Sequence, residues 1–267
     1  LGLGINKGGF VTNLFRDATL AFSLRDLGLG AGEIIEVRRD SNNDFDRFTA
    51  GQINNGSVES FTNGLGLVTW WKEQNGSGNN AIQNTATQQP IIVDASGNLI
   101  MDGNKPSLLF DGSKGMTTPV TKVTDGNWLS MAVVSFLAQT NGQILSADEN
   151  ERIGQILRAR TNKEYTSIAF ENDLTANLVS GGSIVLNEKV LFTSQLDSQL
   201  KTFKNQTELV SNTHQNQNTN NEVFTIGFRN NTEFIDAKIS EVIHFSNYQS
   251  DKRVKYLNKV NNYYGIY

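Results

Sequence analysis

The chain has no cysteine and only two histidines, so several common kinds of reactive site are missing. Without cysteine there is no disulfide, no thiolate-bound zinc and no cysteine nucleophile. His214 and His244 are far apart in the sequence and lack accompanying ligands, so they predict neither a zinc site nor a catalytic base. No glycine-rich loop follows a strand and opens a helix, which leaves nucleotide chemistry without support.

Long apolar runs and clusters of positive charge are also missing. The stretch from Ser130 to Ala138 is among the most apolar, and it is too short to span a bilayer. The net charge is -4 with acids and bases interspersed, so no basic stripe is available for phosphates. We expect a soluble protein with no nucleic acid partner and no membrane insertion. Because the chain opens at Leu1 without methionine, it is compatible with a piece of a longer polypeptide.

What the chain does have is a regular series of short apolar runs separated by turn residues. Such runs recur about every 8 to 12 residues, a spacing typical of sandwiches and barrels. Ile34 to Arg39 alternates apolar with charged residues, as a half-buried strand does. Only Ser250 to Tyr263 keeps a helical period. The sequence therefore predicts an all-β fold, a two-sheet jelly-roll sandwich with a short C-terminal helix.

The expected boundaries follow from the same pattern. We predict one sandwich domain over residues 15–267, preceded by a glycine-rich N-terminal arm over residues 1–14. Residues 13–27 favour a short helix that leads into a strand, because Leu14, Ala18 and Phe22 recur at four-residue steps. The Asn- and Gln-rich stretch from Ser211 to Asn221 has almost nothing to bury and is predicted to be a loop.

A series of local motifs resembles one known family. In order they are Ala21 to Leu27, Ile35 to Ser41, Val68 to Ala81, Gln89 to Ile92 and Asn104 to Gly112. This order is similar to concanavalin A-like lectin/glucanase (LamG-like) domains of phage virion and tail-fibre proteins, and more distantly to the catalytic domain of arabinofuranosidase B, glycoside hydrolase family 54. The family's aromatic-Asp-Gln-Ser-Gly-Asn-Gly loop is replaced here by Lys72 to Gly78, which keeps glycines at 76 and 78. Both glycines suit a backbone with positive φ.

The resemblance implies a function as well as a fold. It implies a structural and recognition module of a phage particle, on a tail fibre, baseplate or capsid surface, that binds bacterial surface carbohydrate. The expected partners are therefore host surface glycans and other virion proteins, in a homo-oligomer on the virion surface. Two alternatives stay open: a glycoside hydrolase of the arabinofuranosidase type, and an extracellular bacterial adhesin domain.

Aromatic residues are the first candidates for a sugar site, since sugars stack on aromatic faces and are fixed by amides and carboxylates. The candidates are Trp70, Trp128, Asp148, Glu149 and Asn150. Adjacent residues of a strand point to opposite faces, so Trp71 is expected to be structural while Trp70 is free to meet a ligand.

Acidic residues provide the candidates for hydrolysis, because a retaining glycosidase needs two carboxyl groups about 5–5.5 Å apart. Asp148, Glu149 and Glu151 form an acidic cluster, with Glu171 and Asp173 as second partners. An acidic turn after a strand is usually just a solvated loop, and the cluster favours that interpretation over catalysis. The arabinofuranosidases that the chain resembles also use an adjacent cysteine pair in the sugar pocket, which this chain lacks. We therefore assign no catalytic residue and expect the protein not to be an enzyme.

The remaining candidate is a calcium site. Asp40, Asn42 and Asp44 are spaced like the start of an EF-hand loop, whereas the glycine and distal glutamate of that loop are missing. A turn rich in Asx residues accounts for the same pattern. We therefore expect no metal and no cofactor, with calcium as the alternative.

Overall fold

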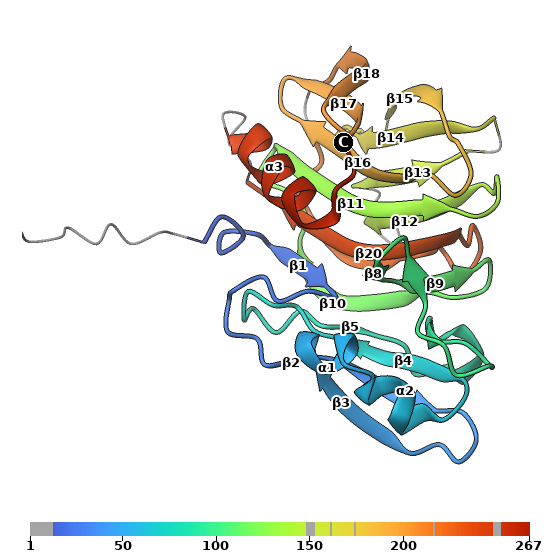
Figure 1. The fold of residues 1–267 in the computed structure, drawn as a ribbon. Helices are drawn as coiled ribbons and strands as arrows, with labels where there is room; N and C mark the ends of the chain where they lie inside the picture. Colours follow the sequence, from blue (N-terminus) through green and yellow to red (C-terminus); the bar gives the residue numbers. More distant parts are fainter. Residues whose placement is uncertain (1–12, 148–152, 161, 174, 216, 248–251) are drawn as a thin grey trace, which may run out of the picture.

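A computed structural model describes residues 13–147, 153–160, 162–173, 175–215, 217–247 and 252–267. Nearly all of its regular structure is β, in agreement with the predicted class (Figure 1). The strands are β1 (Leu20–Ser23), β2 (Glu33–Arg39), β3 (Phe45–Thr49), β4 (Gly66–Trp71), β5 (Ala81–Ile82), β6 (Ile91–Val93), β7 (Met101–Asp102), β8 (Lys105–Pro106), β9 (Leu108–Asp111), β10 (Met116–Lys122), β11 (Trp128–Phe136), β12 (Gly142–Ala147), β13 (Gly154–Ala159), β14 (Glu164–Phe170), β15 (Ala176–Ser183), β16 (Lys189–Leu196), β17 (Gln199–Lys204), β18 (Thr207–Thr213), β19 (Asn221–Ile226) and β20 (Asp236–Phe245). The helices are α1 (Ala50–Asn54), α2 (Ser57–Thr62), the 3-10 turn Ala86–Gln88 and α3 (Arg253–Tyr264).

Strand pairing arranges these elements in two facing layers. One layer runs β3-β2-β4-β5-β10-β19-β12-β13-β14-β15, all antiparallel. The other runs β9-β20-β11-β16-β17-β18, with β1 also paired to β20. Strand β6 pairs with both β4 and β9 and so carries the hydrogen bonding from one layer to the other.

The main core fills the space between the layers. Side chains from both, such as Phe22, Trp71 and Phe192, belong to one continuous cluster of buried apolar residues. In β11 every residue is buried, because alternate side chains enter two different clusters. Ala132 and Val134 join the main core, whereas Met131 and Val133 point to the opposite face of the strand.

That opposite face packs against α3, which lies in front of β11 and β16 in Figure 1. Met131 and Leu191 of the sheet meet Tyr256 and Leu257 of the helix in a second, smaller cluster. The predicted C-terminal helix is therefore present and covers the outer face of the β20-β11-β16 layer. The outer face of the β3-β2-β4-β5-β10 layer carries several exposed side chains instead.

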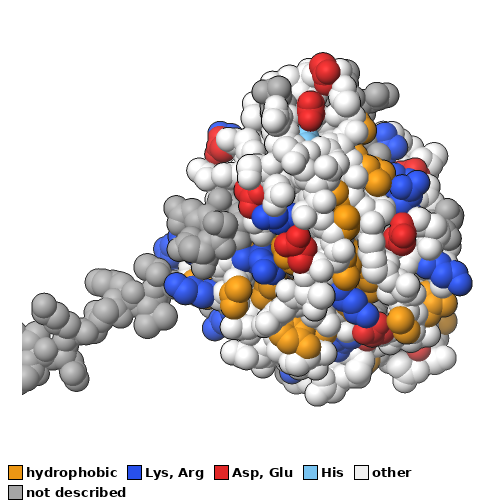
Figure 2. Space-filling model, turned by 90° about the horizontal axis from the view of Figure 1, so that it is seen from above, with side chains coloured by type: hydrophobic (Ala, Val, Ile, Leu, Met, Phe, Trp, Pro, Cys, Tyr) orange, Lys and Arg blue, Asp and Glu red, His pale blue; other side chains and the backbone are white. Residues whose placement is uncertain are grey.

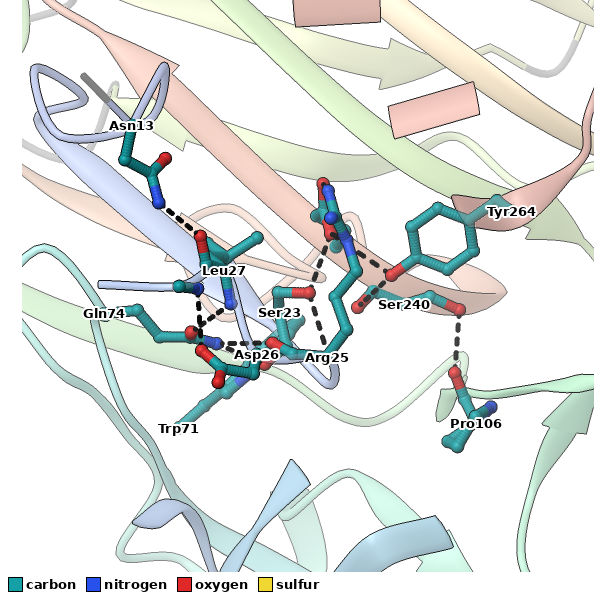
Figure 3. Close-up of polar contacts among 12 residues, drawn as sticks. Asn13, Ser23, Arg25, Asp26, Leu27, Trp71, Gln74, Pro106, Ser240 and Tyr264 are labelled. Atoms are coloured by element: carbon teal, nitrogen blue, oxygen red, sulfur yellow. Dashed lines mark hydrogen bonds and ion pairs between the residues drawn. The ribbon is translucent and has the colours of Figure 1, made fainter. Parts of the chain in front are cut away.

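A buried polar network ties α3 and the first strand to β20. The guanidinium of Arg25 donates two hydrogen bonds to the Glu241 carboxylate, at 2.7 and 2.9 Å. Ser23 donates a third, and the Tyr264 hydroxyl of α3 a fourth at 3.2 Å. Figure 3 shows Ser23, Arg25 and Tyr264 converging on one point, with Gln74 beside them. Burial opposes the charge on Arg25, but Glu241 outweighs it and holds the pKa of Arg25 above its ordinary value.

The surface matches the composition. In Figure 2 most of the visible surface is uncharged and polar, acids and bases are scattered, and a hydrophobic band crosses the face. No helix among the described residues is long and apolar enough to cross a membrane. Residues 1–12 of the expected N-terminal arm lie outside the described residues.

The structure differs from the sequence expectations in three places. Residues 14–17 form turns, and the expected helix there is wrong, because Leu20 and Phe22 enter the main core from strand β1 while Ala21 enters the cluster under α3. Ser211 to Thr213 continue strand β18, and His214 is buried, so the predicted loop is only partly a loop. Helices α1 and α2 were not anticipated, although Thr49 and Gln52 form a capping box at the start of α1.

Candidate functional site

A transverse row of side chains crosses the open face of the β3-β2-β4-β5-β10 layer. Arg47 lies opposite Glu36, and Glu36 lies opposite Trp70 on its other side. Trp70 pairs in turn with Ile82, and Ile82 with Thr117. Residues directly opposite one another in antiparallel strands share a face of the sheet. The register therefore brings five different side chains into one line.

A cavity of about 260 Å³ opens along this row. It is lined by Glu36, Phe45, Thr69, Trp70, Ile82, Gln83, Asn84 and Gln89. Phe45 is 55% exposed and Ile82 39% exposed, so the cavity gathers two exposed large apolar side chains beside Trp70. Apolar surface rimmed by carboxylate and amide groups is typical of a ligand site.

The carboxylate of Glu36 is held in a fixed position beside Trp70. Its Oε1 accepts a hydrogen bond of 2.8 Å from the Thr69 hydroxyl, and its Oε2 accepts one of 2.9 Å from Nε of Arg47. The Arg47 guanidinium also lies over the Trp70 ring, 5.0 Å from its centroid. The charge of Glu36 is thus neutralised within the site, and the carboxylate remains an oriented acceptor.

The amide groups at the floor are ordered as well. Gln83 donates from Nε2 to the Gly115 carbonyl at 2.7 Å and accepts from the Thr85 N–H at 2.9 Å. Gln89 donates to the Gln83 carbonyl at 3.0 Å and accepts from Nε of Arg38 at 2.8 Å. These bonds fix the floor of the cavity. The Asn84 side chain is exposed, and no hydrogen bond to it is found within the described part of the chain.

Of the predicted sugar-binding residues, the structure places Trp70 in this cavity. Trp128 is fully buried, and its Nε1 donates to the Ser194 hydroxyl at 3.3 Å. The proposal of Trp128 as a sugar-contacting residue is therefore corrected, since a side chain without exposed surface cannot stack on a glycan. Trp71 is fully buried, as expected, and donates to the Ser23 carbonyl. Asp148, Glu149, Asn150 and Glu151 lie outside the described residues.

The two acids named as second partners do not line the cavity. The carboxylate of Asp173 accepts from the Thr175 N–H at 2.9 Å, and this bond lowers the pKa of Asp173. Glu171 forms an isolated bridge with Gln217. Asp173 therefore behaves as an ionised turn residue, and neither acid takes part in the cavity.

The Asx-rich turn after β2 is closed by its own hydrogen bonds. Arg38 donates to Asp40 and to Asn43, and Asn42 accepts from the Asp44 N–H. Asn43 has a φ of 62°. Within the described ranges no three His, Asp or Glu side chains gather as a metal site would require.

The loop from Glu73 to Gly78 has the positive φ values predicted at its two glycines, and its role is structural. Gly76 and Gly78 have φ values of 88° and 82°. The Glu73 carboxylate accepts from the N–H groups of Ala21, Asn75 and Ser77, which ties the loop to β1. Burial raises the pKa of Glu73, and these hydrogen bonds oppose the rise.

Sequence reasoning missed most of the cavity. Glu36, Phe45 and Asn84 are ordinary strand and turn residues until the register of β2, β3, β4 and β5 aligns them. One local signal was present: Phe45 follows a polar turn and begins a strand whose next apolar residue, Phe48, lies on the other face. A single exposed aromatic is ordinary, so this signal gains meaning only once the sheet register places Trp70 and Ile82 beside Phe45.

Comparison with known proteins finds similarity only at the level of structure. No family model matches the sequence, and a comparison with curated proteins finds no match. A GH54 α-L-arabinofuranosidase soaked with a cyclic sulfate inhibitor superimposes with a TM-score of 0.61 at 13% identity, over 91% of this chain and 62% of that one. The chain thus spans about three fifths of these arabinofuranosidases.

Two further structures are similar. The receptor binding domain of botulinum neurotoxin D has a TM-score of 0.53 at 9% identity, over 92% of this chain and 53% of that one. A Trypanosoma rangeli sialidase in complex with difluorosialic acid has a TM-score of 0.52 at 14% identity, over 72% of this chain and 31% of that one.

These likenesses confirm the jelly-roll sandwich and correct one functional expectation. The expectation that the protein is not an enzyme is contradicted, because GH54 arabinofuranosidases are among the structures with this fold. The likeness to arabinofuranosidases is confirmed as a likeness of fold, whereas no family model supports the phage virion part of the resemblance. The chain has a β-sandwich fold that it shares with carbohydrate-binding proteins.

Proposed function

We propose that the protein binds carbohydrate in the cavity on the open face of the β3-β2-β4-β5-β10 layer. The observation that carries the proposal is the partly exposed Trp70 beside an oriented carboxylate, Glu36, in a concave site with an amide floor. A sugar ring presents an apolar face for the indole and hydroxyl groups for carboxylate and amide acceptors. The Arg47 guanidinium covers part of the Trp70 ring, so the sugar stacks on the part of the ring that Arg47 leaves open.

Replacing Trp70 with alanine is expected to weaken glycan binding about 30-fold, corresponding to about 2 kcal/mol, because buried aromatic anchors dominate such sites. The fold should persist, since Trp71 and not Trp70 fills the core. Binding is measured on an array of plant and bacterial glycans and then by calorimetry. Leu178→Ala is the matched control, because Leu178 is exposed on β15 and does not line the cavity. Equal binding by Trp70→Ala and the parent protein contradicts the assignment.

A second candidate function is hydrolysis of a glycosidic bond, which the likeness to GH54 arabinofuranosidases favours. Glu36 is one of the two carboxyl groups that such a reaction needs, and the second has to come from outside the residues that line the cavity. If the cavity hydrolyses arabinofuranosyl-substituted xylo-oligosaccharides, Glu36→Gln abolishes release of reducing sugar. Glu188→Gln leaves it intact, because Glu188 pairs with Lys204 just before β16 and does not line the cavity. Sugar release that survives Glu36→Gln assigns the chemistry to other acids.

The motif resemblance supports a narrower form of the proposal, in which the carbohydrate lies on a bacterial surface and the protein belongs to a phage particle. Binding of the labelled protein to intact bacteria, lost in Trp70→Ala, tests the ligand. Co-purification with particles or with secreted material separates the virion role from the adhesin alternative.

A further inference from the structure

A second cavity continues the first along the same face of the sheet. It has a volume of about 400 Å³ and is lined by Ile82, Gln83, Asn84, Thr85, Thr117, Thr118 and Pro119. Ile82, Gln83 and Asn84 line both cavities, so the two form one groove across β4, β5 and β10. Sites for drug-sized ligands have about 300–1,000 Å³. The first cavity alone, at about 260 Å³, falls below that range, whereas the groove reaches it.

The two halves of the groove differ in chemistry. The first half has the aromatic surfaces of Trp70 and Phe45. The second half has small uncharged polar groups, with Asn84, Thr85 and Thr117 exposed. The Thr118 hydroxyl is engaged by the Phe224 N–H at 3.1 Å, whereas the Thr117 hydroxyl makes only a 3.4 Å contact with the Ile82 carbonyl. The second half therefore suits hydroxyl groups that need hydrogen-bond partners but no stacking surface.

The groove also lacks a free positive charge. Glu36 is the one charged side chain among the residues that line its two halves, and Arg47 neutralises it. A sugar carboxylate needs a cation or an unpaired donor cluster to offset its desolvation. An acidic sugar in this groove would meet the Glu36 carboxylate instead.

From the continuity, the chemistry and the charge we infer that the ligand is a neutral oligosaccharide of at least two sugar units. One unit lies against Trp70, and the next lies over Asn84 and Thr117. The glycan thus runs across the strands rather than along one of them. This inference rests on the proposed function and specifies its substrate class.

The test is a calorimetric titration with oligosaccharides of defined length. The probes are the xylo-, arabino-, gluco- and galacto-oligosaccharide series of one to four units, together with sialyllactose as the acidic probe. In the series that binds, the affinity is expected to rise about tenfold or more from one unit to two. Such a rise corresponds to about 1.4 kcal/mol from the contacts of the second unit. Raising the salt concentration should change this affinity less than about twofold, because no net charge is neutralised.

Thr117→Val tests the position of the second unit. The substitution is isosteric and removes one hydroxyl, so the loss of affinity for two-unit ligands should exceed the loss for one-unit ligands about fivefold, as expected when a ligand hydroxyl loses its partner. Thr207→Val is the matched control, since Thr207 is exposed on β18 and outside the groove. Trp70→Ala should lower the affinity for every length.

Each outcome decides between the claims. Equal affinity for one and two units overturns the two-unit inference and leaves carbohydrate binding in place. Tighter binding of sialyllactose than of any neutral probe overturns the neutral class. Absence of binding by every probe overturns the proposed function itself, together with this inference.

Discussion

Glu241→Gln is expected to lower the free energy of unfolding by about 3–5 kcal/mol, the cost of leaving one partner of a buried ion pair without the other. The side chains of Arg25 and Glu241 are 7% and 1% exposed. Two guanidinium nitrogens of Arg25 donate to the two carboxylate oxygens of Glu241, at 2.7 and 2.9 Å. The amide that replaces the carboxylate keeps the volume but removes the charge that offsets Arg25. Because Tyr264 also donates to Glu241, the substitution loosens α3 from the sheet. Urea denaturation followed by fluorescence measures the change.

Glu188→Gln provides the comparison for this result. Glu188 pairs with Lys204 at the same 2.7 Å distance, but the two side chains are 37% and 23% exposed. Water screens such pairs, and their loss costs about 1 kcal/mol or less. Equal losses in Glu241→Gln and Glu188→Gln would show that burial does not matter here. The double variant Arg25→Met/Glu241→Leu should recover much of the stability, because no uncompensated charge remains buried.

The fold could be predicted from the sequence because its strands are marked locally. Strand β2 follows the alternation of Ile34 to Arg39, and α3 follows the period of residues 250–263. Helices α1 and α2 are too short to show a period, and the cap at Thr49 marks α1 alone. The helix predicted over residues 13–27 is wrong because its apolar spacing has another cause. Side chains at the spacing of a helical turn enter two clusters on either side of strand β1.

The candidate site could be predicted only in part, for a related reason. Alternation along β4 placed Trp70 and Trp71 on opposite faces, and this gave one correct surface residue. The same argument cannot tell whether Trp128 is exposed, because α3 and the opposite layer bury both faces of β11. Glu36, Phe45 and Asn84 meet through pairings between strands, and such register depends on the whole sheet.

The stability of the protein is expected to fall between about pH 6.5 and pH 4 because of His244. His244 is fully buried in β20, where Ser130 donates to its Nδ1 at 2.7 Å and its Nε2 donates to the Val123 carbonyl at 2.6 Å. The ring also packs on Phe224, with centroids 4.8 Å apart. Burial lowers the pKa of His244 to about 4, against the smaller opposing effect of the Val123 carbonyl. The imidazole is therefore neutral in the folded protein at neutral pH.

The sign of the effect follows from which state binds the proton first. Above pH 6.5 the imidazole is neutral in both states, and His244 contributes no pH dependence. As the pH falls below 6.5 the unfolded chain takes up the proton while the folded chain does not, so the free energy of unfolding declines by about 3 kcal/mol by pH 4 and then levels off. His244→Gln, measured by urea denaturation at pH 7.5, 6 and 4.5, should lose this part of the decline. His214→Gln should retain it and lose only the share of His214 itself, whose pKa burial also lowers. An unchanged decline in His244→Gln would mean that other groups, chiefly carboxylates, set the acid sensitivity and that the buried imidazole is not its source.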